Sequence, residues 1–132
     1  MEELVARLAS IAGIDAATAE KAIGIILAFL EKEGPADAVA KLVDAIPGAR
    51  DAVNNVLNAE GSSGGLMGML GGMLGNMGGG VTALGGKLMG IGLDLGQMQT
   101  IGKELFAYGS EKAGPEVVGR IVSEVPGLGQ FV

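Results

Sequence analysis

Two stretches of the chain follow one plan and decide the fold: IDAATAEKAIGIILAFLEKEGPADAVAKLVDAIPGA at residues 14–49 and LDLGQMQTIGKELFAYGSEKAGPEVVGRIVSEVPGL at residues 93–128. Each begins with an Asp in front of an apolar pattern, contains a Gly-Pro pair, and ends on an apolar residue followed by Pro-Gly. The spacing from that Asp to the final Pro is identical in the two copies. Such a repeat defines the architecture as similar units placed side by side.

Each copy predicts a helical hairpin, a long helix followed by a short one. Asp15 and Asp94 are good N-caps, because an Asp side chain accepts hydrogen bonds from the first free N–H groups of a helix. Gly34 and Gly114 suit helix ends, and the proline after each suits the first turn of the next helix. The expected helices are 16–33 and 35–45 in the first copy, and 95–112 and 115–124 in the second.

Residues 61–91 form an insert of different character, rich in Gly and Met and free of charge until Lys87. Leucine and methionine recur there at helical spacing, with glycines on the other side. Each interior glycine costs about 1 kcal/mol relative to alanine, so such a helix needs a close neighbour. The apolar stripe consists of Met67, Met69, Leu70, Met73, Leu74 and Met77. The glycines expected to allow close helix packing are Gly68, Gly72, Gly75, Gly102 and Gly109.

The predicted fold is all-α: two pseudo-symmetric helical hairpins flank a central Gly/Met-rich helical hairpin. Residues 1–132 are expected to form a single domain, a common size for one core, with the internal repeat at 13–53 and 92–132. Further helices are expected over 2–12, 48–59 and 82–92. No segment alternates apolar and polar residues for long enough to indicate a strand.

The composition argues against an enzyme. The chain contains no His and no Cys, which removes the usual general base near neutral pH, thiolate chemistry and the commonest metal ligands. Asp15 and Asp94 are explained by capping, and Gly85-Gly86-Lys87 lacks the spacing and the Ser or Thr of a phosphate-binding loop. We therefore expect no catalytic residues, no cofactor and no metal.

The charge distribution argues against nucleic acid as a partner. The net charge is −6, and the nine Lys and Arg residues are spread along the chain, whereas binding to phosphates needs clustered cations. Glu2 and Glu3 stand where a secretory signal would be positive. The sequence therefore predicts no nucleic-acid partner and a cytoplasmic location.

The repeated hairpin resembles that of small bacterial proteins grouped as domains of unknown function. The resemblance rests on AEKAIGIILAFLEKEG, the Gly34-Pro35 turn and the endings LVDAIPGA and IVSEVPGL. With its Gly/Met-rich middle, the whole chain is also similar to a family labelled VcgC/VcgE-like. Both resemblances imply a helical fold, and neither implies an activity or any site residue.

Three functions remain open, and the first is favoured. The apolar content of 48% and the glycine face favour a non-enzymatic interaction or scaffold protein that self-associates into a homo-oligomer. The second is a carrier or sensor of a small apolar ligand, held by the methionines of the insert, since methionine suits adaptable apolar surfaces. The third, less favoured, is membrane contact through 61–92, which is long enough to span a bilayer but glycine-rich.

Overall fold

The computed structural model describes residues 2–62, 81–125 and 128–130. All regular structure in these ranges is helical, which confirms the all-α prediction. The elements are α1 (Glu2–Ala12), α2 (Ala16–Glu33), α3 (Ala36–Ala45), α4 (Ala49–Ser62), α6 (Val81–Gly90), α7 (Leu95–Ala113), α8 (Pro115–Glu124) and a short 3₁₀ helix, η1 (Leu128–Gln130).

The two predicted N-caps are confirmed. The Asp15 Oδ1 accepts a hydrogen bond from the Thr18 N–H at 3.0 Å. Asp94 forms a reciprocal capping box: its Oδ1 accepts from the Gln97 N–H at 2.7 Å, and its own N–H donates to Gln97 Oε1 at 3.0 Å. The Gln97 amide also donates to the Ala12 carbonyl at 2.9 Å, so the start of α7 is attached to the end of α1.

Glycines with positive φ end the helices that precede these caps. Gly13 has φ 68° and Gly92 has φ 96°, a left-handed conformation that glycine adopts without penalty. The next residue donates back into the helix in both places, Ile14 to the Ala9 carbonyl at 3.1 Å and Leu93 to the Leu88 carbonyl at 3.2 Å. This bond is typical of the Schellman helix end. It explains why α6 ends before the predicted residue 92.

The helix order of the first half recurs in the second half. The bounds of α1, α2 and α3 return in α6, α7 and α8 at one offset along the chain, within a residue. The contacts also correspond, because α1 packs on α7 while α6 packs on α2. This is a correspondence of bounds and neighbours; the pseudo-symmetric placement of two hairpins in space stays a prediction.

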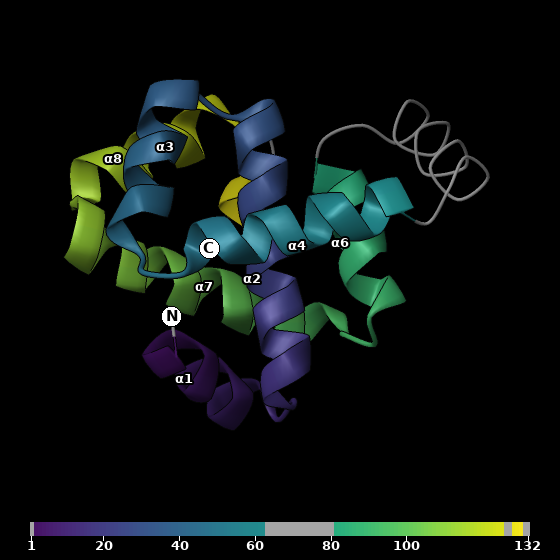
Figure 1. Ribbon diagram of the computed structural model, residues 1–132. Coiled ribbons are helices and arrows are strands. Elements are labelled where there is room, and N and C mark those ends of the chain that lie inside the picture. The colour runs from purple at the N-terminus through teal and green to yellow at the C-terminus, as the bar shows by residue number, and fades with distance from the viewer. Residues whose placement is uncertain (1, 63–80, 126–127, 131–132) are drawn as a thin grey trace.

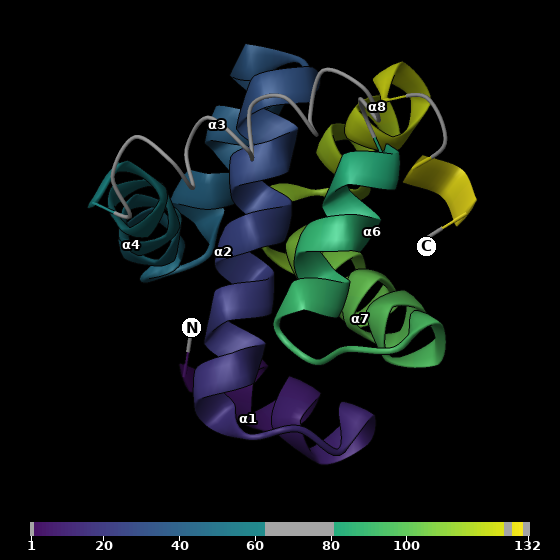
Figure 2. The ribbon, with the colours of Figure 1, turned by 90° about the vertical axis from the view of Figure 1, so that its right-hand side faces the viewer.

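The helices pack around α2 and α7 (Figures 1 and 2). In Figure 2, α2 stands between α4 and α6, and contacts both. In Figure 1, α3 lies against α8, and α1 crosses α2 and α7. The long helix of the first copy is therefore covered on several sides, as its wide apolar stripe requires.

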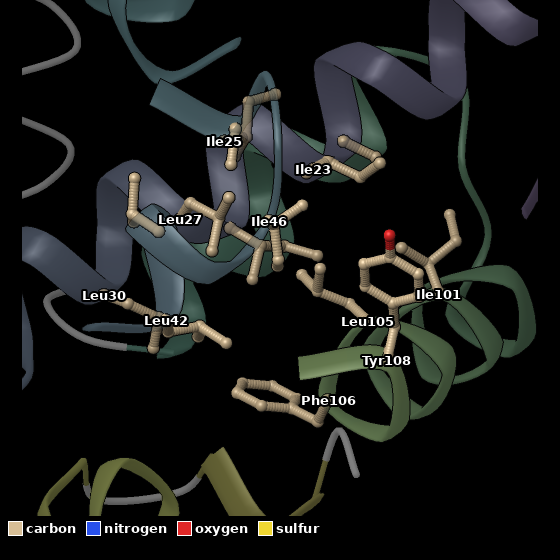
Figure 3. Packing of buried hydrophobic residues seen from close by; sticks show 14 of the residues in the cluster. Ile23, Ile25, Leu27, Leu30, Leu42, Ile46, Ile101, Leu105, Phe106 and Tyr108 are labelled. Atoms are coloured by element: carbon tan, nitrogen blue, oxygen red, sulfur yellow. The ribbon is translucent and has the colours of Figure 1, made fainter. Parts of the chain in front are cut away.

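The core forms where α2, α3 and α7 meet, shown in Figure 3. Leu27 and Leu30 of α2 approach Leu42 of α3, and Ile101 and Leu105 of α7 close the cluster from the opposite side. All five side chains are fully buried. Truncating one of them to alanine is expected to cost about 2–5 kcal/mol, since a cavity remains.

Candidate functional site

An apolar groove lies between α2, α4 and α6, with a cavity volume of about 570 Å³. This volume falls within the range of about 300–1,000 Å³ that is usual for small-molecule sites. The groove is lined by Ala17, Glu20, Lys21 and Ile25 of α2, Ala52, Asn55 and Val56 of α4, and Lys87, Gly90 and Ile91 of α6 and its end.

The α2 and α4 walls are held together by an unusually close approach at Gly24. A Cβ on Gly24 would lie 2.6 Å from the Ala52 carbonyl oxygen and 2.7 Å from Val56 Cγ2. Both distances are too short for a real side chain, so only glycine permits this spacing of the two helices. Ala52 and Val56 also line the groove, next to Ile25. The close contact therefore fixes the side of the groove that α4 provides.

The α6 wall is anchored in the core by its opposite face. Leu84 and Leu88 are buried with relative exposures of 2% and 0%, whereas Lys87 and Gly90 face solvent and line the groove. The lining pairs the first turns of α2 with the last turn of α6, because the two helices run in opposite directions (Figure 2). The buried leucines thus set the position of the polar and small residues on the groove side.

The groove has an apolar floor and a charged rim. Ile25 is 9% exposed, and Val56 and Ile91 are partly buried against the core. Glu20, Lys21 and Lys87 are exposed. Close by, Asp15 is held as a carboxylate: hydrogen bonds from the Thr18 side chain and N–H lower its pKa, and the positive charge of Lys21 adds to this effect. Charged side chains therefore border the apolar floor at the start of α2.

The charged groups of the described groove lining lie at the surface. Among the residues whose burial is described, no charged side chain is buried, and no group of three or more acidic residues in the described ranges could hold a metal ion. Among the described lining residues, the polar groups are one carboxylate, two ammonium groups and the Asn55 amide, all in contact with water. Groups of this kind, placed around an apolar floor, serve to orient a ligand.

Most of the residues singled out by the sequence lie outside the described ranges. These are Met67, Met69, Leu70, Met73, Leu74 and Met77 of the apolar stripe, and Gly68, Gly72 and Gly75. Gly102 and Gly109 are buried on α7. A Cβ on Gly109 would collide with Leu42 Cδ1 and would lie 3.4 Å from Val118 Cγ2, so the neighbours of Gly109 are α3 and α8.

The groove residues themselves were not singled out by sequence reasoning. The sequence did contain one indication: Ala17, Lys21 and Ile25 are spaced four residues apart, so they lie on one face of α2. Along that face the side chains are first small, then basic and then apolar. The walls formed by α4 and α6 could not be predicted from the sequence, because they depend on how these two helices pack on α2.

Comparison with known proteins gives no relative: no protein-family model, curated protein or solved structure matches the chain. The resemblance to helical-hairpin proteins of unknown function therefore stays a prediction. In the described part of the chain, no helix is both long and apolar enough to cross a bilayer. The segment on which membrane contact was predicted lies mostly outside that part.

Proposed function

We propose that the protein is a non-enzymatic binding protein for a small ligand with an apolar body, held in the groove between α2, α4 and α6. The observation that carries the proposal is the groove itself, with a floor formed by Ile25, Val56 and Ile91. A ligand that covers this floor removes apolar surface from water, worth about 25 cal/mol per Å². This is the second of the functions expected from the sequence, with a different set of lining residues.

Self-association is less well supported than ligand binding. The large apolar side chains exposed in the described part of the chain are Ile11, Met89 and Leu95, and single surface residues of this kind are common on monomers. In the described part of the chain, the hydrophobic core accounts for the high apolar content that suggested self-association. A homo-oligomer stays a prediction for which no described surface offers specific support.

The proposal is tested with Nile red, an uncharged apolar dye whose fluorescence rises in an apolar site. Ala17 is exposed and lines the groove, so Ala17→Leu places a larger side chain in it while leaving the core intact. Ala107→Leu makes the same change on the exposed surface of α7, away from the groove. We expect saturable dye binding that is weakened about tenfold by Ala17→Leu and unchanged by Ala107→Leu.

Equal binding by the two variants, or no saturable binding by the folded wild-type protein, would overturn the proposal. Circular dichroism of both variants establishes that each is folded, which keeps a loss of binding separate from a loss of structure. The ten-fold expectation corresponds to about 1.4 kcal/mol, comparable to the loss of apolar contact by a ligand displaced from part of the floor.

A further inference from the structure

We propose that Gly90 determines how broad a ligand the groove accepts, so that the groove takes compact or fused-ring apolar bodies as well as single chains. The inference rests on the proposed function and deepens it, because it names the shape of ligand that the same site admits. Among the described lining residues, Gly90 alone has no side chain. It is the last residue of α6, so the described α6 wall has a gap at this point.

Neither the backbone nor the described packing around Gly90 requires a glycine. Gly90 is not one of the described glycines with positive φ, so its backbone suits any residue. A Cβ built on it would have no described atom within 4 Å. Gly85 and Gly86 of the same helix are equally unconstrained, but of the three only Gly90 lines the groove. A side chain at residue 90 would therefore occupy open space next to the groove.

The helical positions of α6 show where that side chain would stand. Leu84 and Leu88 mark the buried face of the helix, and Ile91, directly after α6, packs beside that face and lines the groove. At about 100° per residue, Gly90 lies on the same side of the helix as Ile91 but farther from the buried face. A side chain at residue 90 would therefore narrow the mouth of the groove and leave its apolar floor unchanged.

The opposite wall also carries a small residue at this end of the groove. The two helices run in opposite directions, which brings the first turn of α2 beside the last turn of α6 (Figure 2). Ala17 and Gly90 are both exposed and both line the groove. The mouth is therefore bordered by small residues on two helices, which leaves room for a body broader than one alkyl chain. Such a body covers more apolar surface of the groove and binds more tightly for that reason.

The test compares decanol with adamantanol, two neutral alcohols that have the same number of carbon atoms and one hydroxyl group each. Decanol is a flexible chain, whereas adamantanol is a compact cage, so the two ligands differ in breadth and share a head group. Each is titrated calorimetrically into the full-length protein. The wild-type protein should bind both alcohols saturably.

Gly90→Leu should weaken adamantanol binding about tenfold, the scale of a steric conflict at a packed site. Decanol should be weakened about twofold or less, because a narrow chain loses little apolar contact with the floor. Gly90→Ala should give a smaller loss in the same order. Because alanine is the better helix former and its Cβ meets no described atom, Gly90→Ala should also raise the urea midpoint. A loss of binding is thereby separated from a loss of structure.

Gly119→Leu on α8 is the matched control, because Gly119 is exposed, has no described atom within 4 Å of an added Cβ, and is not among the described lining residues. It should leave both affinities unchanged. Equal effects of Gly90→Leu on the two alcohols, or no effect on either, would overturn the role of Gly90 and leave the proposed function standing. Wild-type protein that binds Nile red but not adamantanol would also overturn it. Binding of neither alcohol, nor of Nile red, would overturn both.

Discussion

Gly24 of α2 lies directly against the main chain of Ala52 on α4, so that a Cβ at residue 24 would come within 2.6 Å of the Ala52 carbonyl oxygen. The same two helices carry Ile25 and Val56, which line the groove. A glycine that weakens α2 as an isolated helix is therefore the residue that lets α4 approach closely enough to form one wall.

Replacing Gly24 with alanine should destabilise the protein in spite of the better helix propensity. The added Cβ meets main-chain atoms, which cannot rotate away, so we expect overpacking of about 3 kcal/mol against about 1 kcal/mol of gained propensity. The free energy of unfolding, measured by urea denaturation, should therefore fall by about 2 kcal/mol. Gly119→Ala on α8 is the matched control, because nothing lies within 4 Å of its added Cβ, and it should be neutral or stabilising by up to about 1 kcal/mol. A Gly24→Ala variant as stable as Gly119→Ala would contradict the close approach.

Gly109 of α7 should be coupled to Leu42 of α3. Its added Cβ meets the end of the Leu42 side chain, which can shift, so Gly109→Ala should cost only about 1 kcal/mol. Leu42→Ala alone should cost about 2–5 kcal/mol, because this side chain is fully buried. In the double variant the collision is absent, and Gly109→Ala should become favourable. A double-mutant cycle by urea denaturation measures the coupling, and additive effects would rule out the contact.

Removing the Asp94 cap should destabilise α7 and its junction with α1. Asp94→Ala deletes one half of the capping box with Gln97, and losing an N-cap typically costs about 0.5–2 kcal/mol. Asp94→Asn preserves an acceptor and should recover most of that loss. Thermal unfolding of the two variants separates these outcomes. Equal losses for alanine and asparagine would show that the acceptor oxygen is not what stabilises the helix start.

An ion pair joins α8 to α3: Arg120 Nη1 lies 2.8 Å from Asp37 Oδ2. This pair should make the stability of the protein depend on pH. The side-chain hydrogen bond from Arg120 lowers the pKa of Asp37 below its ordinary 3.8. Because the folded-state pKa is the lower one, the stabilisation is complete above the ordinary value and is lost as pH falls through the folded value. The effect is small, since both side chains are exposed.

Urea midpoints measured from about pH 5 downward test this. Wild type should lose more stability than Asp37→Asn over that interval, and the two should converge at the acidic end. Asp15 has a pKa lowered in the same direction by Thr18, so Asp37→Asn should keep part of the acid sensitivity. Parallel curves for the two proteins would show that the ion pair contributes nothing.

Local chemistry explains why the helices could be predicted. Asp15 and Asp94 cap helices through contacts three residues away, and the Gly-Pro pairs act within one turn. Such signals are complete within a short window of sequence. The differences are small and have local causes: Pro35 is the N-cap of α3, with an extended ψ of 118°, so that α3 begins at Ala36.

The groove could not be predicted in the same way, because its walls come from three helices. In the sequence Ile25 is one apolar residue among many in the predicted helix 16–33. Only the packing of α4 and α6 on either side of α2 places it at the bottom of a groove. Gly24 likewise reads as a weak point in a helix until Ala52 is placed beside it. Contacts across the sequence decide both roles.

The central claim, that the groove between α2, α4 and α6 is a ligand site, is tested most directly by methyl NMR of the full-length protein titrated with Nile red. The account predicts saturable shifts of the Ile25, Val56 and Ile91 methyl signals with one common affinity. Ile101 and Ile121, fully buried elsewhere in the core, should not move. Shifts confined to exposed residues such as Ile11, or no saturable shift at the three groove residues, would contradict it.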